Sequence, residues 1–123
     1  MIANRVHHLS FAVSDLDRSR RFYGGVLGLE TIDRPDLGLP GIWYEAGNAE
    51  IHLIQTPEGA DVGTRPKSIT PLANHNAFAV EDYQATVDHF KRAGVDVLET
   101  SAERGQLWVC DPDGNVLEFI TAP

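Results

Sequence analysis

Short apolar runs alternate with turn-forming residues along the chain, and their lengths predict the secondary structure. Residues 6–13 have the length and apolar content of a buried strand, and Ser14-Asp15 then supplies residues that cap a helix. Apolar side chains share one stripe of residues 17–27, so a helix is predicted there, ending at Gly28. Three strands are predicted next, the last two joined by a Gly-Asn hairpin turn, over residues 29–33, 42–46 and 50–55.

The same order of elements is predicted a second time, from residue 73 onward. Its members are a strand over 75–80, a helix over 83–93, a strand over 95–99 and a hairpin of 106–110 with 116–120. Residues 57–72 are rich in Pro, Gly, Thr and Asp and predict a linker. We therefore expect one α+β domain over residues 1–123, made of module one (1–56), the linker and module two (73–123).

The two modules are similar in sequence as well as in pattern. The segment His8-Leu-Ser-Phe-Ala-Val-Ser-Asp15 matches His75-Asn-Ala-Phe-Ala-Val-Glu-Asp82, and Ile51-His52-Leu-Ile matches Leu117-Glu118-Phe-Ile. The match places His8 on His75 and His52 on Glu118. Because copies of one unit tend to pack about a pseudo-twofold axis, equivalent positions can converge on one point, which is how a repeat builds a metal site.

Strand alternation decides which way these four side chains point. A period of two puts His8 with Ser10 and Ala12 on one face of its strand, and the large apolar residues on the face toward the helix. The same rule applies to the strands of His52, His75 and Glu118, so all four share the face away from the helices. A carboxylate buried there needs a cation, which predicts metal binding by His8, His75 and Glu118. His52 is expected either as a fourth ligand or as a neighbour of the ligands.

Other candidate residues are expected to be structural or, for His7 and His89, either structural or on the surface. His7 and His89 have no partner of ligand type in the repeat, Cys110 lies in an apolar run that predicts a buried thiol, and Trp43 and Trp108 are expected in the core, one residue apart in register. Eighteen acidic against ten basic residues give a net charge of −8, which repels nucleic acid and anionic membranes. The chain has no membrane span or secretion signal, so we expect a cytoplasmic protein.

Several motifs together resemble the vicinal oxygen chelate superfamily, which includes glyoxalase I, bleomycin resistance proteins and extradiol dioxygenases. They are His8-x-x-x-x-Val-Ser-Asp-Leu-Asp-Arg-Ser, Phe22-Tyr23-x-x-Val-Leu-Gly-Leu29, Ile51-His52-Leu53 and Asp111-Pro-Asp-Gly-Asn-x-x-Glu118. The resemblance covers essentially the whole chain and implies two βαβββ modules whose mixed sheets curve around a metal-binding cleft. It also implies metal ligands at His8, His52, His75 and Glu118, a catalytic role for Glu118 and, as in many short members, a homodimer.

Four protein ligands on one divalent ion (Ni, Zn, Co, Mn or Fe(II)) leave two open positions for vicinal oxygens of a small-molecule substrate. This arrangement favours lyase or isomerase chemistry by proton transfer through Glu118. If His52 is not a ligand, His8, His75 and Glu118 form the facial triad of an extradiol-type dioxygenase. A drug-binding protein of the bleomycin-resistance type or a fosfomycin-type resistance protein is a further alternative. Glyoxalase I usually has a glutamate where this chain has His52, which leaves glutathione dependence open.

Overall fold

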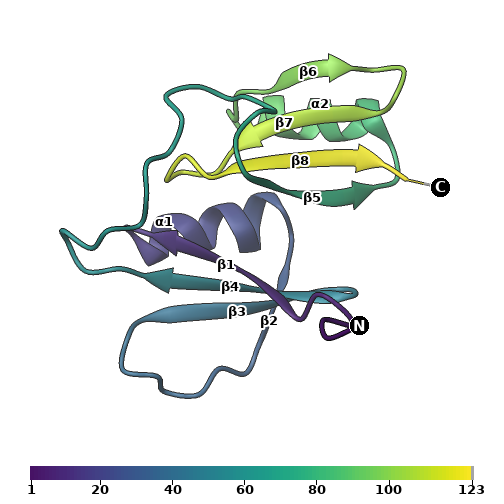
Figure 1. Cartoon of the computed structure of the whole chain (residues 1–123). Coiled ribbons are helices and arrows are strands. Elements are labelled where there is room, and N and C mark those ends of the chain that lie inside the picture. The colour runs from purple at the N-terminus through teal and green to yellow at the C-terminus, as the bar shows by residue number, and fades with distance from the viewer. Residues whose placement is uncertain (123) are drawn as a thin grey trace. The chain divides into compact units, whose positions relative to one another are not determined.

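The computed structural model describes residues 1–122 and divides the chain into two compact units, residues 1–63 and 64–123. Each unit contains one four-stranded mixed sheet with helical structure packed on one face (Figure 1). Both units have the order strand, helix and three strands. The predicted α+β class with two similar βαβββ modules is therefore confirmed. No helix among the described residues is long and apolar enough to cross a membrane.

In the first unit the strands are arranged β1-β4-β3-β2, with β1 parallel to β4 and the other pairs antiparallel. The core lies between this sheet and the helix, where Phe11 and Tyr23 are buried with ring centroids 5.5 Å apart. The elements are β1 His8–Val13, α1 Leu16–Arg20, η1 Arg21–Val26, β2 Glu30–Ile32, β3 Gly41–Ala46 and β4 Ala49–Gln55.

The helix predicted over residues 17–27 is present, but its second half is wound as a π-helix. Asp15 caps its start by accepting a hydrogen bond from the backbone N–H of Arg18 (3.1 Å). At its end the N–H of Leu27 bonds to the carbonyl of Phe22, five residues back (2.9 Å). Gly24 lies here beneath the Tyr44 hydroxyl, which would be 3.4 Å from an added Cβ. An added Cβ would therefore be in ordinary van der Waals contact with Tyr44.

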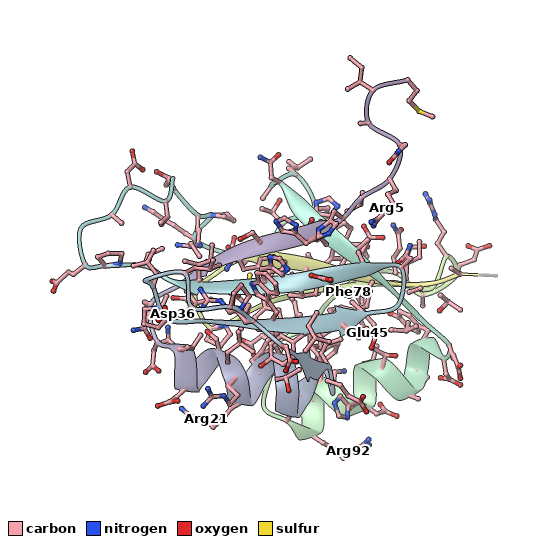
Figure 2. The ribbon with its side chains drawn as sticks, turned by 90° about the horizontal axis from the view of Figure 1, so that it is seen from below. Arg5, Arg21, Asp36, Glu45, Phe78 and Arg92 are labelled. Carbon is pink, nitrogen blue, oxygen red and sulfur yellow. The ribbon has the colours of Figure 1, made fainter. Side chains whose placement is uncertain are left out.

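In the second unit the strands are arranged β5-β8-β7-β6, with β5 parallel to β8. Phe119 on β8 connects the layers, because its ring stacks on Phe78 (5.4 Å) and meets Phe90 of the helix edge-on (4.9 Å). The elements are β5 His75–Val80, α2 Tyr83–Arg92, β6 Leu98–Ser101, β7 Gln106–Cys110 and β8 Val116–Thr121. Figure 2 shows Arg21 and Arg92 on the outer side of the helix of their own unit, away from its sheet.

One strand of the second unit lies later than predicted. The sequence pattern placed it over residues 95–99, whereas β6 spans Leu98–Ser101. Val95 instead donates its N–H to the carbonyl of Phe90 (2.9 Å), and Gly94 has a φ of 75°, so these residues complete the helix terminus. Val95, whose apolar side chain suggested a strand, is therefore part of the helix terminus and not of β6.

Cys110 is less enclosed than its apolar neighbours suggested. It lies at the end of β7 and is half-buried. Burial, followed by the charge of Asp111, raises the pKa of its thiol. The side chain is therefore held as the protonated, poorly nucleophilic thiol, which fits the structural role expected for it.

Tyr83 connects the start of α2 to β6 through a hydrogen bond that is pH-dependent. Its hydroxyl donates to Oε1 of Glu99 (2.7 Å), and burial together with this carboxylate raises the pKa of Tyr83 to about 12. A folded-state pKa above the unfolded value of about 10 means that the stabilisation is complete below pH 10 and lost as the pH approaches 12. We expect Tyr83→Phe to lower the free energy of unfolding by about 1 kcal/mol at pH 7. Urea denaturation at pH 7 and pH 11 should show the difference between the two proteins shrinking at the higher pH.

Candidate functional site

In the first unit, His8 and His52 lie on the sheet face away from the helix, as the strand alternation predicted. Their rings stack with centroids 4.0 Å apart and 14° between their planes. On the other side of His52, the indole of Trp43 stacks at 4.1 Å and 6°. The His52 ring lies between the rings of His8 and Trp43 and nearly parallel to both, and His52 is only 7% exposed.

Glu50 makes the polar contact of His52. Oε1 of Glu50 lies 2.9 Å from Nε2 of His52, and the two residues are on the same face because they are two apart on β4. An ionised carboxylate can only accept a hydrogen bond, so Nε2 carries the proton and Nδ1 carries the lone pair of the neutral ring. This hydrogen bond is the main cause that lowers the pKa of Glu50. The pair is therefore a carboxylate bonded to an imidazole whose Nε2 carries a proton, so the neutral form of the ring has one defined tautomer.

His8 has a different environment, because it is exposed at the start of β1. Its Nδ1 lies 2.9 Å from Nδ1 of His7, so one of these nitrogens donates to the other. Burial, then the neighbouring His52 and His7 rings, lower the pKa of His8, and these effects outweigh the opposite influence of Glu50. The neutral form, which is the form that binds metals, is favoured. His7, expected to be structural or on the surface, is thus a direct neighbour of the site.

In the second unit, His75 and Glu118 are brought together on the equivalent face. Nε2 of His75 is 3.4 Å from Oε1 of Glu118, whose side chain is 9% exposed. Nδ1 of His75 is 2.7 Å from the carbonyl oxygen of Ala73, which can only accept. Nδ1 therefore carries a proton, and Nε2 faces Oε1 of Glu118.

The other oxygen of Glu118 has its own partner. Nε2 of Gln106 donates to Oε2 of Glu118 over 3.1 Å. Trp108 meets His75 edge-on at 4.6 Å and donates its indole N–H to the hydroxyl of Thr100 (2.8 Å). Gln106 and Trp108 are two apart on β7 and so share its inner face.

Trp108 is buried, as the sequence suggested, and Trp43 is half-buried, but the two are not one step out of register. In the ladders Trp43 is the partner of His52 and Trp108 is the partner of Glu118, so they hold equivalent positions beside the candidate ligands. The second hairpin has a longer turn (residues 111–115) than the first (residues 47–48), and the extra length compensates for the offset.

The longer turn is organised by Asp111, which is 4% exposed. Its Oδ1 accepts from the backbone N–H groups of Asp113 and Asn115 (2.9 Å each), and its Oδ2 accepts from Nδ2 of Asn115 (2.7 Å). The Asp-Pro-Asp-Gly-Asn motif is thus a structural turn. Its role is to set the register that places Trp108 opposite Glu118.

Because Asp111 satisfies several donors at once, its removal leaves buried N–H groups without acceptors. We expect Asp111→Ala to reduce the free energy of unfolding by about 2–3 kcal/mol. Asp61→Ala is the matched control, since Asp61 makes a single exposed bond of the same kind to the N–H of Gly63 (2.9 Å). Chemical denaturation of both variants checks the prediction, and equal losses would contradict it.

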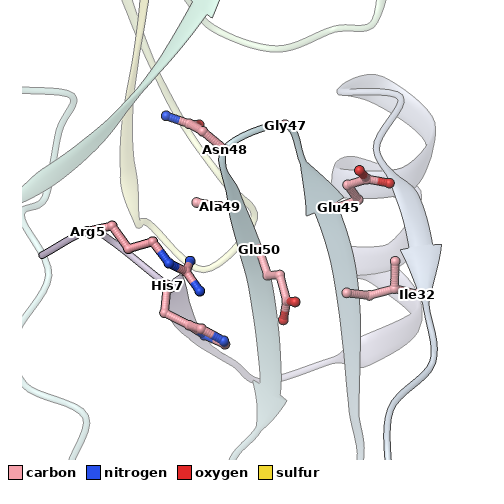
Figure 3. Close-up of a pocket in the computed structure, with 8 residues that line it drawn as sticks. All are labelled: Arg5, His7, Ile32, Glu45, Gly47, Asn48, Ala49 and Glu50. Atoms are coloured by element: carbon pink, nitrogen blue, oxygen red, sulfur yellow. The ribbon is translucent and has the colours of Figure 1, made fainter.

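An open depression of about 390 Å³ lies beside the His52–Glu50 pair in the first unit. Figure 3 shows Glu50 between Arg5 and His7 on one side and Glu45 and Ile32 on the other. Sequence reasoning missed Glu50 and Gln106. The same period of two that selected His52 also places Glu50 on its face, and this signal could have identified it.

The structure thus brings the predicted site residues together as two pairs, one pair in each unit. Over residues 1–122, no group of three or more His, Cys, Asp or Glu side chains is arranged to hold a metal ion as it stands. His89 is exposed on α2, and its ring centroid lies 5.9 Å from that of Phe90.

Comparisons with known proteins agree with this architecture. Residues 5–119 match the family described as the glyoxalase/bleomycin resistance protein/dioxygenase superfamily. The chain is 31% identical over 120 residues to Glyoxylase I 4 of Arabidopsis thaliana, covering 93% of this chain and 68% of that protein. It is 33% identical over 99 residues to an ethylmalonyl-CoA/methylmalonyl-CoA epimerase of Cereibacter sphaeroides, covering 76% and 74%. A crystal structure from Bacillus anthracis, assigned to the glyoxalase family, has a TM-score of 0.79 and 25% identity, covering 100% and 98%.

Proposed function

Since the chain belongs to the glyoxalase/bleomycin resistance protein/dioxygenase superfamily, we propose that it is an enzyme of the glyoxalase-like type that depends on a divalent metal. The proposed ligands are His8, His52, His75 and Glu118, from one chain or from two copies of it. The substrate is a small molecule that offers two vicinal oxygens, and the reaction is of the lyase or isomerase type. The metal is one of Ni, Zn, Co, Mn and Fe(II), which all accept imidazole with carboxylate.

The observation that carries the proposal is the contact between His75 and Glu118. Nε2 of His75 and Oε1 of Glu118 lie 3.4 Å apart, and the two side chains are 27% and 9% exposed. Two electron-rich atoms repel each other at this distance unless a proton or a metal cation lies between them. The bond from Nδ1 of His75 to a backbone carbonyl is also the contact that metal-binding histidines usually make. This pair therefore fits a divalent ion.

The pair in the first unit fits the same ion only after a side-chain rotation. The rings of His8 and His52 are almost parallel, and parallel planes 4.0 Å apart cannot both direct an in-plane lone pair at one point. His8 is exposed and has room to turn, whereas His52 is held by Trp43 and Glu50. We expect His8 to be the ring that moves.

When bound, the metal would polarise a substrate carbonyl and stabilise the negative charge that develops on its oxygen. Glu118 is the proposed proton carrier. Its carboxylate takes the proton from the carbon next to the carbonyl, the C–H electron pair moves into the carbonyl, and the same carboxylate returns the proton. Gln106 holds Oε2 of Glu118 and so fixes the orientation of the carboxylate.

The names of the relatives favour this proton-transfer chemistry. A glyoxalase and an acyl-CoA epimerase are among the proteins similar to this chain. Hydroxy-carbonyl compounds and 2-substituted malonyl thioesters, which both have an acidic C–H beside a carbonyl, are the first substrates to test. Deuterium incorporation from D2O, followed by NMR, reports C–H cleavage with either class.

Metal removal tests the site without any substrate. A ligand bound only by the folded state stabilises it by about 2.7 kcal/mol at 100 times its Kd, so chelation should lower Tm by roughly 10 °C. Elemental analysis of protein purified without chelator should find one divalent ion per site. His75→Ala and Glu118→Ala should lose the ion and the chelator effect.

The matched control for these variants is His89→Ala, which removes a histidine of the same unit from the helix surface. It should keep the metal content and the response to chelator. An unchanged Tm on chelation of metal-loaded wild-type protein would refute the metal site. No metal even after reconstitution would instead favour a drug-binding protein of the bleomycin-resistance type.

Glu118→Gln separates the catalytic role from the ligand role. The amide keeps an oxygen that can bind metal but cannot take up a proton, so deuterium incorporation should fall by a factor of about 100 or more. Metal content should fall less. If metal and activity are lost to the same extent, Glu118 is a ligand without a separate catalytic role.

The ring stack also favours one second candidate. If His52 stays bonded to Glu50 and does not ligate, then His8, His75 and Glu118 remain as a facial triad. Such a triad with Fe(II) suits extradiol ring cleavage of catechols. His52→Ala distinguishes the two: metal loss supports the four-ligand site, and iron retained at the wild-type level supports the dioxygenase. Homodimer formation stays a prediction, which sedimentation velocity can check.

A further inference from the structure

We infer that Glu50 is the positioning residue for His52, and that it fixes the ring so that Nδ1 is the nitrogen offered to a metal ion. That His52 binds a metal rests on the proposed function. The contact between Glu50 and His52 is a hydrogen bond between two side chains of the chain and does not depend on that proposal. Nothing in the sequence motifs pointed to Glu50.

The stacked rings fix the plane of the His52 ring but not which edge of the ring faces Glu50. Trp43 and His8 lie on the two faces of His52, at 4.1 and 4.0 Å, so they define the plane of its ring. A rotation of 180° about the Cβ–Cγ bond leaves this plane unchanged but exchanges each nitrogen with a carbon. Stacking therefore cannot choose between the two ring orientations.

The hydrogen bond to Glu50 selects one of the two orientations of the His52 ring. In one orientation Nε2 lies 2.9 Å from Oε1 of Glu50, and in the other a ring carbon would occupy that place. The carboxylate accepts and cannot donate, so it also assigns the proton to Nε2. One contact thus selects both the orientation and the tautomer, and leaves the Nδ1 lone pair free.

Glu50 also brings a negative charge next to the His52 ring. Its side chain is 33% exposed at the edge of the open depression, whereas the imidazole that it contacts is 9% exposed. A carboxylate bonded to one ring nitrogen makes the other nitrogen a stronger ligand. The second unit uses the opposite tautomer, because the Ala73 carbonyl takes the Nδ1 proton of His75 and leaves Nε2 free.

Glu45 provides a matched control on the neighbouring strand. It is the direct cross-strand partner of Glu50, lines the same depression and has the same charge. The hydrogen bond to His52 is made by Glu50. A general effect of negative charge would therefore be similar for both residues, whereas positioning is specific to Glu50.

The tautomer is measured first, on metal-free protein, by two-bond 1H–15N correlation NMR of the imidazole rings. Wild-type His52, assigned by comparison with His52→Ala, should give the pattern of a ring protonated at Nε2. Glu50→Ala should convert this pattern to averaged nitrogen shifts, while Glu45→Ala should retain it. Glu50→Gln, which keeps an acceptor oxygen and the side-chain volume, should retain most of it and guards against loss of folding in the alanine variant.

Metal affinity is measured next, by titration with Co(II) alone and detection of its visible absorption. Loss of a carboxylate that orients a ligating histidine raises Kd by about 10- to 100-fold, and this is expected for Glu50→Ala. Glu50→Gln should give a smaller rise and Glu45→Ala less than a threefold change. Equal changes for Glu45→Ala and Glu50→Ala would overturn the inference in favour of a charge effect.

The two measurements separate the inference from the proposed function. If wild-type protein binds no Co(II) but the tautomer depends on Glu50, the metal proposal fails and the positioning role stands. If Co(II) binds with a Kd that is the same in wild type and Glu50→Ala, or if the tautomer is unchanged by that substitution, the positioning role fails and the metal proposal stands.

Discussion

Parallel pairing of the first and last strand in each unit is the constraint on which the site depends. It makes Ser10 the ladder partner of His52 and Ala77 the partner of Glu118, so each candidate ligand of the last strand faces a small residue of the first. The histidine two positions earlier on the first strand then becomes its diagonal neighbour, within reach on the same face. A shift of one residue in either ladder would turn these side chains toward the helix.

The sequence predicted this part of the structure well, because strand alternation and a visible repeat both act over short distances. It predicted the two βαβββ units and the strand alternation that places His8, His52, His75 and Glu118 on the face away from the helices. It did not predict the π-helical turn over Arg21–Val26. It also misplaced Trp108, because the ladder position of that residue depends on how many residues the Asp111 turn holds outside the strands. A local sequence pattern does not predict features that depend on contacts between distant segments.

Each unit holds its buried candidate ligand with one polar neighbour. Glu50 on the same strand holds His52, and Gln106 on the adjacent strand holds Glu118. In both cases the neighbour is found two positions from another residue of the site, which the alternation of the strand requires. Both units therefore anchor the candidate ligand by a hydrogen bond, but the partners differ. Glu50 supplies an acceptor to the imidazole of His52, and Gln106 supplies a donor to the carboxylate of Glu118.

This difference bears on the reaction under the proposed function. A neutral imidazole that ligates a metal has no free nitrogen with which to take a proton. Among the four proposed ligands, proton transfer then falls to Glu118. Inversion at one carbon needs groups on opposite faces of the substrate, one to remove the proton and one to supply it. A single carboxylate removes and returns a proton on the same face, which suits movement of hydrogen between adjacent carbons of a hydroxy-carbonyl compound. Under the proposed function, a site with Glu118 as its one proton carrier would suit isomerase chemistry better than epimerisation.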